Sequence, residues 1–362
     1  MSGGEREEAA EPSGGFAERL LVWYDRHGRR DLPWHRPATA YRVWISEIML
    51  QQTRVETVRP YFTRFVERFP DVHALAQAPL DEVLAHWSGL GYYARARNLH
   101  RAAGLIVAEH GGEPPDDLAA LEALPGIGRS TAGAIQSLAR GHRAAILDGN
   151  VKRVLARHAG VAGWPGRAPV QRALWAEAEK RLPRQRVGAY NQALMDLGAG
   201  ICQRRPRCAD CPVAGDCVAR AQGRTVELPA PKPKRAWPTR EGVVLVLQHA
   251  VDDTVLLERR PAHGIWGGLW SLPEFPDLTT LQGWLATRGI TAAPATLPPL
   301  EHGFTHFRYR MHPCHVCTKR LDTAEQGQEW ARPEQPPGGL PAPIKRLLDE
   351  VVAVGAGGRS RP

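Results

Sequence analysis

Four cysteines in one short segment constrain this chain more than any other feature. Cys202, Cys208, Cys211 and Cys217 have the spacing C-x5-C-x2-C-x5-C. We expect no secretory signal peptide and therefore a reducing compartment, where clustered thiols hold a metal more often than they form disulfides. Four thiolates so placed can hold a tetrahedral zinc ion or a [4Fe–4S] cluster, and the spacing does not decide between the two.

The hydrophobic pattern changes its period at a segment rich in proline and lysine, ELPAPKPKRAWPTR. Before it, apolar residues recur at the three- and four-residue spacings of helices; after it, alternating runs predict strands. The predicted division is a disordered tail at 1–13, a helical domain at 14–221, a linker at 222–240, a mixed α and β domain at 241–353 and a second tail at 354–362.

Within the second domain, two runs predict a hairpin, another predicts a third strand and two more predict helices. These runs are EGVVLVLQ (241–248), TVLLERR (254–260), FRYRMHPCHVC (307–317), TTLQGWLATRG (279–289) and PIKRLLDEVVA (343–353).

The chain has 362 residues and a formal net charge of +9. That balance fits either a solvated basic surface or a polyanionic partner such as nucleic acid. No apolar run reaches the length of a membrane span, so we expect no membrane association and a cytoplasmic location.

The stretch LPGIGRST (124–131) predicts a tight turn between two helices, within a helical hairpin at about 120–134. Gly126 and Gly128 have no side chain to block the close approach of a sugar-phosphate backbone. The exposed backbone N–H groups of such a turn bind phosphates without reading the base sequence. An ordinary helix–helix turn is the alternative.

Two carboxylates carry possible acid–base chemistry. Glu47 lies in the apolar helical stretch VWISEIML, where burial would raise its pKa and keep a proton available. Asp148 precedes the helix GNVKRVLARH, and an ionised partner beside a protonated acid can stabilise a sugar cation. Otherwise Glu47 is a surface residue of an amphipathic helix, and Asp148 is an N-cap.

Several long motifs resemble those of one family. LPGIGRSTAGA, LDGNVKRVLARH, VWISEIMLQQT, GLGYYARARNL and the four cysteines are similar to the helix-hairpin-helix DNA glycosylases of the MutY type, which act on adenine. The resemblance implies two helical subdomains beside a cleft, a [4Fe–4S] cluster and a Nudix-like C-terminal domain. It also implies a monomer that acts on double-stranded DNA and excises adenine mispaired with 8-oxoguanine or guanine.

The resemblance assigns chemical roles to four positions. Glu47 protonates adenine N7, Asp148 stabilises the sugar cation, and Asn150 orients the site. Ser130 stands where bifunctional relatives have a lysine nucleophile; a serine forms no Schiff base, which implies a monofunctional enzyme that uses water.

Further positions match binding sites of the family. Those of the adenine pocket are Arg30, Trp34 and Gln192. Those that open the duplex around 8-oxoguanine are Gln52, Leu90 and Tyr92, and Gly126 and Gly128 contact the DNA backbone.

In the C-terminal domain, GIWGGLWSLPEF resembles the start of a Nudix fold, but no REx2EE helix follows, so we expect no pyrophosphatase activity. Phe304, Thr305 and His306 resemble a Phe-Ser-His loop that senses 8-oxoguanine. Cys314 and Cys317 are interpreted mainly as small apolar strand residues, and zinc ligation with the nearby His312 and His315 is the lesser alternative.

The sequence departs from the family in one place, and two rival functions remain. Five residues, not the usual six, separate the first two cluster cysteines. A glycosylase for oxidised pyrimidines is disfavoured by Ser130 and by the C-terminal domain. A non-catalytic iron–sulfur DNA-binding protein would need neither Glu47 nor Asp148.

Overall fold

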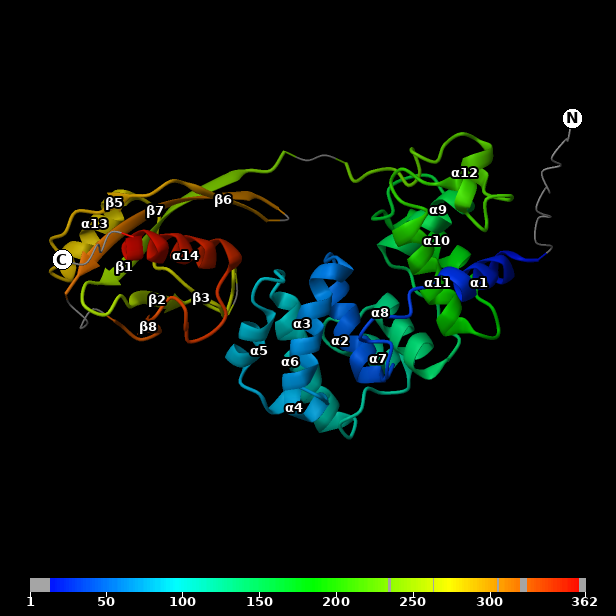
Figure 1. Ribbon diagram of the computed structural model, residues 1–362, viewed down its shortest axis with the longest axis horizontal. Coiled ribbons are helices and arrows are strands. Elements are labelled where there is room, and N and C mark those ends of the chain that lie inside the picture. Colours follow the sequence, from blue (N-terminus) through cyan, green and yellow to red (C-terminus); the bar gives the residue numbers. More distant parts are fainter. Residues whose placement is uncertain (1–13, 234–235, 263, 305, 320–323, 358–362) are drawn as a thin grey trace, which may run out of the picture. The chain divides into compact units, whose positions relative to one another are not determined.

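The computed structural model describes residues 14–357 apart from 234–235, 263, 305 and 320–323. Two compact units divide the chain, and Figure 1 labels their elements. The described residues of 14–55 and 105–233 form the first unit, and those of 56–104 and 236–357 form the second. No helix among these described residues combines the length and apolar character needed to cross a membrane.

The first unit is helical, as predicted. Its elements are α1 (Phe16–His27), α2 (Ala40–Leu50), α7 (Leu118–Ala123), α8 (Arg129–Ala134), the π-helical turn η1 (Ile135–Ala139), α9 (Gly149–His158), α10 (Ala168–Lys180), α11 (Val187–Gly200), the 3₁₀ turn η2 (Cys208–Asp210) and α12 (Val218–Ala221).

The predicted helical hairpin is confirmed. Asp117 caps α7 by accepting a hydrogen bond from the amide of Ala120, and the chain then turns before α8. Gly126 has a φ of 80°, in the left-handed region that glycine adopts without strain. Gly128 is the N-cap of α8 and provides no side chain to cap the first amides of that helix.

Two glycines let neighbouring segments approach the N-terminus of α9. A Cβ atom on Gly133 of α8 would lie 2.2 Å from the Ala145 carbonyl oxygen. One on Gly198 of α11 would lie 2.6 Å from the Cβ atom of Asn150. Because real Cβ contacts are longer than this, both positions need glycine for α8 and α11 to pack against this region.

The second unit begins with helices. It holds most of α3 (Val55–Arg68) and of α6 (Ala94–Glu109), together with α4 (Val72–Gln77) and α5 (Leu80–Trp87). The stretch YRVWISEIMLQQTRVETV, which has a helical pattern throughout, is divided between α2 and α3. Gln52 has a φ of 61° between them, and a left-handed residue ends a right-handed helix.

A mixed sheet forms the rest of the second unit. β1 (Thr239–His249) pairs antiparallel with β2 (Val255–Arg259) and parallel with β7 (Arg308–Thr318), which confirms the hairpin and the third strand. The other elements are β3 (Trp270–Ser271), β4 (Glu274–Phe275), α13 (Leu278–Thr287), β5 (Ala295–Thr296), β6 (Leu300–Gly303), β8 (Gln328–Ala331) and α14 (Ala342–Gly357).

Both faces of this sheet are covered. Successive residues of β1 point to opposite faces, yet all of 243–247 are buried. Leu245 and Leu247 share a core with Leu281 and Leu285 of α13. The two predicted helices are confirmed as α13 and α14, but α14 continues to Gly357, into the segment predicted as a tail.

The close contact at Gly198 predicts a loss of stability in Gly198→Ala. The added methyl group would collide with Asn150 and its backbone, and such overpacking costs about 1–3 kcal/mol. Thermal unfolding measures the effect. Gly200→Ala is the matched control, since a Cβ atom at that position of the same helix meets nothing within 4 Å. Equal melting temperatures for the two variants would contradict the packing argument.

Candidate functional site

Asp148 caps helix α9, and its carboxylate is held on both oxygens. Oδ1 accepts a hydrogen bond from the amide of Val151 at 2.7 Å, and Oδ2 accepts one from the side-chain amide of Asn150 at 3.2 Å. Asp148 is therefore the N-cap of α9, which is the structural role that the sequence predicts as the alternative. It also fixes where the carboxylate lies, because a cap must stand at the helix N-terminus.

Glu47 lies on α2 among apolar residues, and only part of its surface is exposed. Burial, together with the negative charge of Asp148, raises the pKa of its carboxyl group to about 8. The fold therefore brings Glu47 and Asp148 within electrostatic range of each other, which their spacing in the sequence does not reveal. At neutral pH the Glu47 carboxyl group is mainly protonated.

The environment of Asp148 differs from that of Glu47. Burial raises the pKa of the Asp148 carboxyl group above its usual value, but the hydrogen bonds from Val151 and Asn150 and the positive charge of Arg153 oppose that rise. Because these donors stabilise the carboxylate, the proton of the pair belongs on Glu47. The site thus holds one acid and one anion.

Ser130 lies at the start of α8 and supports the segment before Asp148. Its Oγ accepts a hydrogen bond from the amide of Leu147 at 3.0 Å. The side chain therefore links the helical hairpin to the residue next to Asp148.

Asn150 and Arg153 connect Asp148 to the cysteine segment. The Arg153 guanidinium group donates to the Oδ1 of Asn150 at 2.8 Å and to the backbone carbonyls of Gly198 and Cys202, each at 2.7 Å. The Asn150 amide is thereby oriented so that its NH₂ group faces Asp148.

Arg30 and Gln192 both line a cleft of about 330 Å³, which also includes His35 and Tyr24. Gln192 donates to Asp196 at 2.8 Å, and its Oε1 lies 3.2 Å from Nε2 of His35. This cleft brings together two of the three residues predicted for the adenine pocket. His35 was missed, and its position next to the predicted Trp34 was the available signal.

Trp34, the third predicted pocket residue, is buried. Its side chain is only 3% exposed, and it is not among the described residues that line the cleft. Its ring lies edge-on to that of His35, at 6.4 Å between centroids. Trp34 therefore supports the cleft wall from behind.

The residues predicted to open the duplex differ in exposure. Gln52 of the first unit is exposed in its left-handed turn. In the second unit, Tyr92 is 47% exposed with a φ of 50°, whereas Leu90 is only 6% exposed. The structure therefore presents Gln52 and Tyr92 to solvent but not Leu90.

Phe304 packs in an aromatic cluster at the end of β6. Its ring centroid lies 4.7 Å from those of His302 and Phe307 and 5.6 Å from that of Trp266. His306 is exposed, and Thr305 lies outside the described residues.

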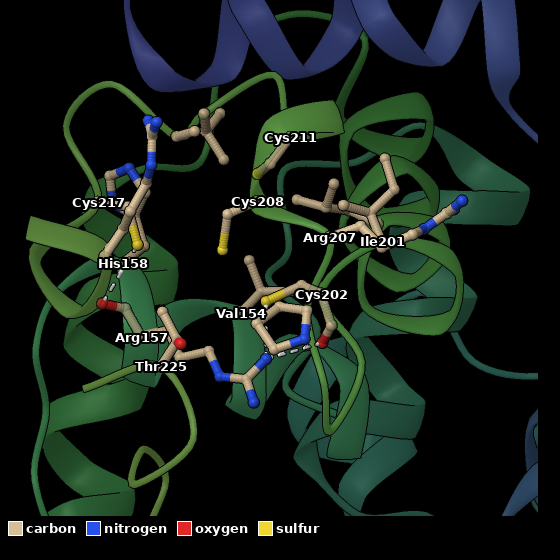
Figure 2. Close-up of a pocket in the computed structure, with 15 residues that line it drawn as sticks. Val154, Arg157, His158, Ile201, Cys202, Arg207, Cys208, Cys211, Cys217 and Thr225 are labelled. Carbon is tan, nitrogen blue, oxygen red and sulfur yellow. Dashed lines mark hydrogen bonds between the residues drawn. The ribbon is translucent and has the colours of Figure 1, made fainter. Parts of the chain in front are cut away.

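All four cysteines of the segment line one pocket (Figure 2). Arg157, only 3% exposed, donates to the Sγ atom of Cys202 at 3.3 Å. Burial raises the pKa of the Cys211 thiol to about 11, so thiolates there need a cationic partner. Among the described residues, no three Cys, His, Asp or Glu side chains are grouped to hold a single metal ion.

Cys314 and Cys317 lie on β7, outside that segment. Cys314 is buried in the core beneath α13, and Cys317 is exposed with its Sγ atom 3.8 Å from Nε2 of His315. His312 pairs with Glu241 at 3.0 Å.

The raised pKa of Glu47 predicts a pH-dependent stability. The unfolded chain releases this proton near pH 4.5 and the folded chain near pH 8, so the group lowers stability progressively as the pH rises between these values. Glu47→Gln removes that cost. The variant should melt at a higher temperature than the wild type at about pH 9 and at a similar one at about pH 4, measured by thermal unfolding. A constant difference across the range would contradict the raised pKa.

Comparisons with known proteins agree with this architecture. Residues 45–180 match the model of the HhH-GPD superfamily base excision DNA repair proteins, and residues 243–350 match that of the NUDIX domain. A solved thermostable thymine-DNA glycosylase is 28% identical, with a TM-score of 0.52, covering 57% of this chain and 95% of that one.

Curated relatives match across most of the chain. An adenine DNA glycosylase from Buchnera aphidicola subsp. Acyrthosiphon pisum (strain APS) is 35% identical over 340 residues, which cover 92% of this chain and 97% of the relative. An adenine DNA glycosylase from Homo sapiens is 39% identical over 317 residues, covering 73% of this chain and 57% of the relative. The chain therefore belongs to the adenine DNA glycosylase family of base excision repair enzymes.

Proposed function

We propose that the enzyme excises adenine mispaired with 8-oxoguanine or guanine in double-stranded DNA, by hydrolysis of the N-glycosidic bond. One observation carries the proposed mechanism: Glu47, with a pKa of about 8, lies within electrostatic range of a hydrogen-bonded Asp148. The pair supplies a proton for a leaving base and a negative charge for a developing sugar cation.

In this mechanism Glu47 protonates N7 of adenine, and the bond between C1′ and N9 then breaks with its electron pair passing to the base. Asp148 stabilises the oxocarbenium-like sugar, while Asn150 holds the Asp148 carboxylate in place. Water adds to C1′, and the proton that it loses returns to the Glu47 carboxylate, which leaves an abasic site and free adenine. The reaction consumes one water molecule and no other reactant.

Ser130 supports a monofunctional reaction. Its hydroxyl group accepts a hydrogen bond from the amide of Leu147. The side chain has no amine with which to form a Schiff base. We therefore expect the enzyme to leave the sugar-phosphate backbone intact.

The cleft lined by Arg30 and Gln192 is the proposed adenine pocket, with Trp34 behind its wall. Its volume of about 330 Å³ lies within the range of small-molecule sites. An adenine must leave the base stack to enter it, which costs least at a mispair.

The proposed DNA contacts lie in both units. The turn at Gly126 and Gly128 would bind the phosphate backbone, and the exposed Gln52 and Tyr92 would enter the duplex. His306, with Thr305 beside it in the sequence, would contact 8-oxoguanine. We expect the protein to act as a monomer in the cytoplasm, with a helical glycosylase domain at 14–221 joined by a linker at 222–240 to a Nudix-like domain at 241–353.

The cysteine pocket is proposed to hold a [4Fe–4S] cluster. The four thiols line one pocket, and four cysteine thiolates are the ligand set of such a cluster. Cys202, Cys208, Cys211 and Cys217 would be the ligands, and the cluster would stabilise the loop that carries them. The arginine contact to Cys202 would offset the negative charge of the thiolates.

The excision reaction provides a direct test. A duplex with one adenine opposite 8-oxoguanine is incubated with enzyme in a single-turnover experiment, and strand breaks are measured with and without alkali. We expect breaks at the adenine only after alkali, and a loss of about 100-fold or more in Glu47→Gln, because the general acid is removed. Breaks without alkali would indicate a lyase, and tight binding without excision would favour the non-catalytic rival.

The cluster is tested by iron and sulfide analysis of the purified protein. We expect about four iron atoms and four sulfides per chain, and their loss in Cys208→Ser, because a serine oxygen is a poor ligand for this cluster. Cys317→Ser, which changes an exposed cysteine elsewhere, is the matched control. Zinc in place of iron, or unchanged iron in Cys208→Ser, would refute the assignment.

A further inference from the structure

The turn between α5 and α6 is held from the C-terminal half of the same compact unit. The backbone carbonyl of Leu340, in the segment before α14, accepts hydrogen bonds from the Ser88 hydroxyl and from the Tyr93 hydroxyl, each at 3.0 Å. These donors stand at either end of the turn that carries Leu90 and Tyr92. A single carbonyl oxygen therefore binds both ends of the turn.

The turn needs such support because several of its residues have left-handed backbone conformations. Gly89, Gly91 and Tyr92 have φ angles of 98°, 70° and 50°, and a left-handed tyrosine is strained unless its surroundings hold it. The amide of Gly89 donates to the Tyr93 hydroxyl at 3.3 Å, so the same phenol contacts the turn and Leu340 together.

Burial makes these bonds effective. Leu340 is 2% exposed and Tyr93 is 7% exposed, so water cannot easily replace a hydrogen bond that is lost here. Removing one partner therefore leaves a buried polar group unsatisfied, which costs stability. The Tyr93 hydroxyl is protonated at neutral pH, and burial raises its pKa above the usual value. The two hydroxyl protons match the two lone pairs of one carbonyl oxygen.

A second contact joins the helices of the second unit to its C-terminal half, near the aromatic cluster around Phe304. The Arg97 guanidinium group of α6 donates to the carbonyl of Gly267 at 2.6 Å. Gly267 follows Trp266, whose ring packs against Phe304. The helix that follows the turn is thus linked to the residue next to Trp266, which packs against Phe304.

We propose that the turn carrying Tyr92 is coupled to Phe304. Ser88 and Tyr93 are the positioning residues that hold the turn on the Leu340 carbonyl, and Arg97 links the helix after the turn, through Gly267 and Trp266, to Phe304. The inference rests on the proposed function, in which His306 contacts 8-oxoguanine and Tyr92 enters the duplex. The coupling makes the geometry of the turn depend on the C-terminal domain, so adenine excision responds to the base opposite.

The test uses full-length protein with both hydroxyl groups removed, Ser88→Ala together with Tyr93→Phe. Arg259→Ala is the matched control, because it breaks the Arg259–Asp81 ion pair, at 2.7 Å, without touching the turn. Single-turnover excision rates are measured on duplexes with adenine opposite 8-oxoguanine and opposite guanine. In the double variant we expect the first rate to fall about tenfold and the second to fall less, so that the preference for 8-oxoguanine shrinks.

Hydrogen–deuterium exchange supplies a readout that does not depend on activity. Backbone amides of 88–93 should exchange faster in the double variant than in the wild type or in Arg259→Ala. Unchanged exchange, or equal slowing on both duplexes, would overturn the coupling. A wild type that shows no preference for 8-oxoguanine would instead overturn the proposed specificity and the coupling with it.

Discussion

The capping of helix α9 by Asp148 is the interaction on which the site depends. A carboxylate that accepts a hydrogen bond from a backbone amide at a helix N-terminus is held in position, and the amide stabilises its charged form. Around it, Ser130 holds the preceding residue, Asn150 holds the second oxygen, and Gly198 lets α11 approach. Each of these contacts limits where the anion can lie, so structural and chemical demands on Asp148 coincide.

Glu47 gains its acid character from the same arrangement. It has apolar neighbours on α2, and Asp148 contributes a negative charge. Two carboxyl groups in one site separate into an acid and an anion when only one of them receives hydrogen bonds. The difference between them therefore arises from their surroundings, because in water the two groups titrate at similar pH.

The second unit combines a sheet with helices that precede it by more than a hundred residues in the chain. Three hydrogen bonds between these two parts end on backbone carbonyls, at Gly267 and Leu340, which receive side-chain donors from α6 and from the turn before it. Every residue type has a backbone carbonyl group, so these contacts do not require a particular residue at the accepting position. A sequence pattern therefore does not reveal the contacts.

The sequence by itself determined the elements and the chemistry available to them. Helical and strand periods predicted α8, β1, β7 and α13, because burial on one face leaves a repeating pattern. Tertiary structure decided which residues meet: Glu47 with Asp148, His35 with Gln192, and Tyr93 with Leu340. It also buried Leu90 and Trp34, which motifs alone place at the site. Local patterns report which face of an element is buried, whereas pKa values and distant contacts depend on how the elements pack, which no local pattern contains.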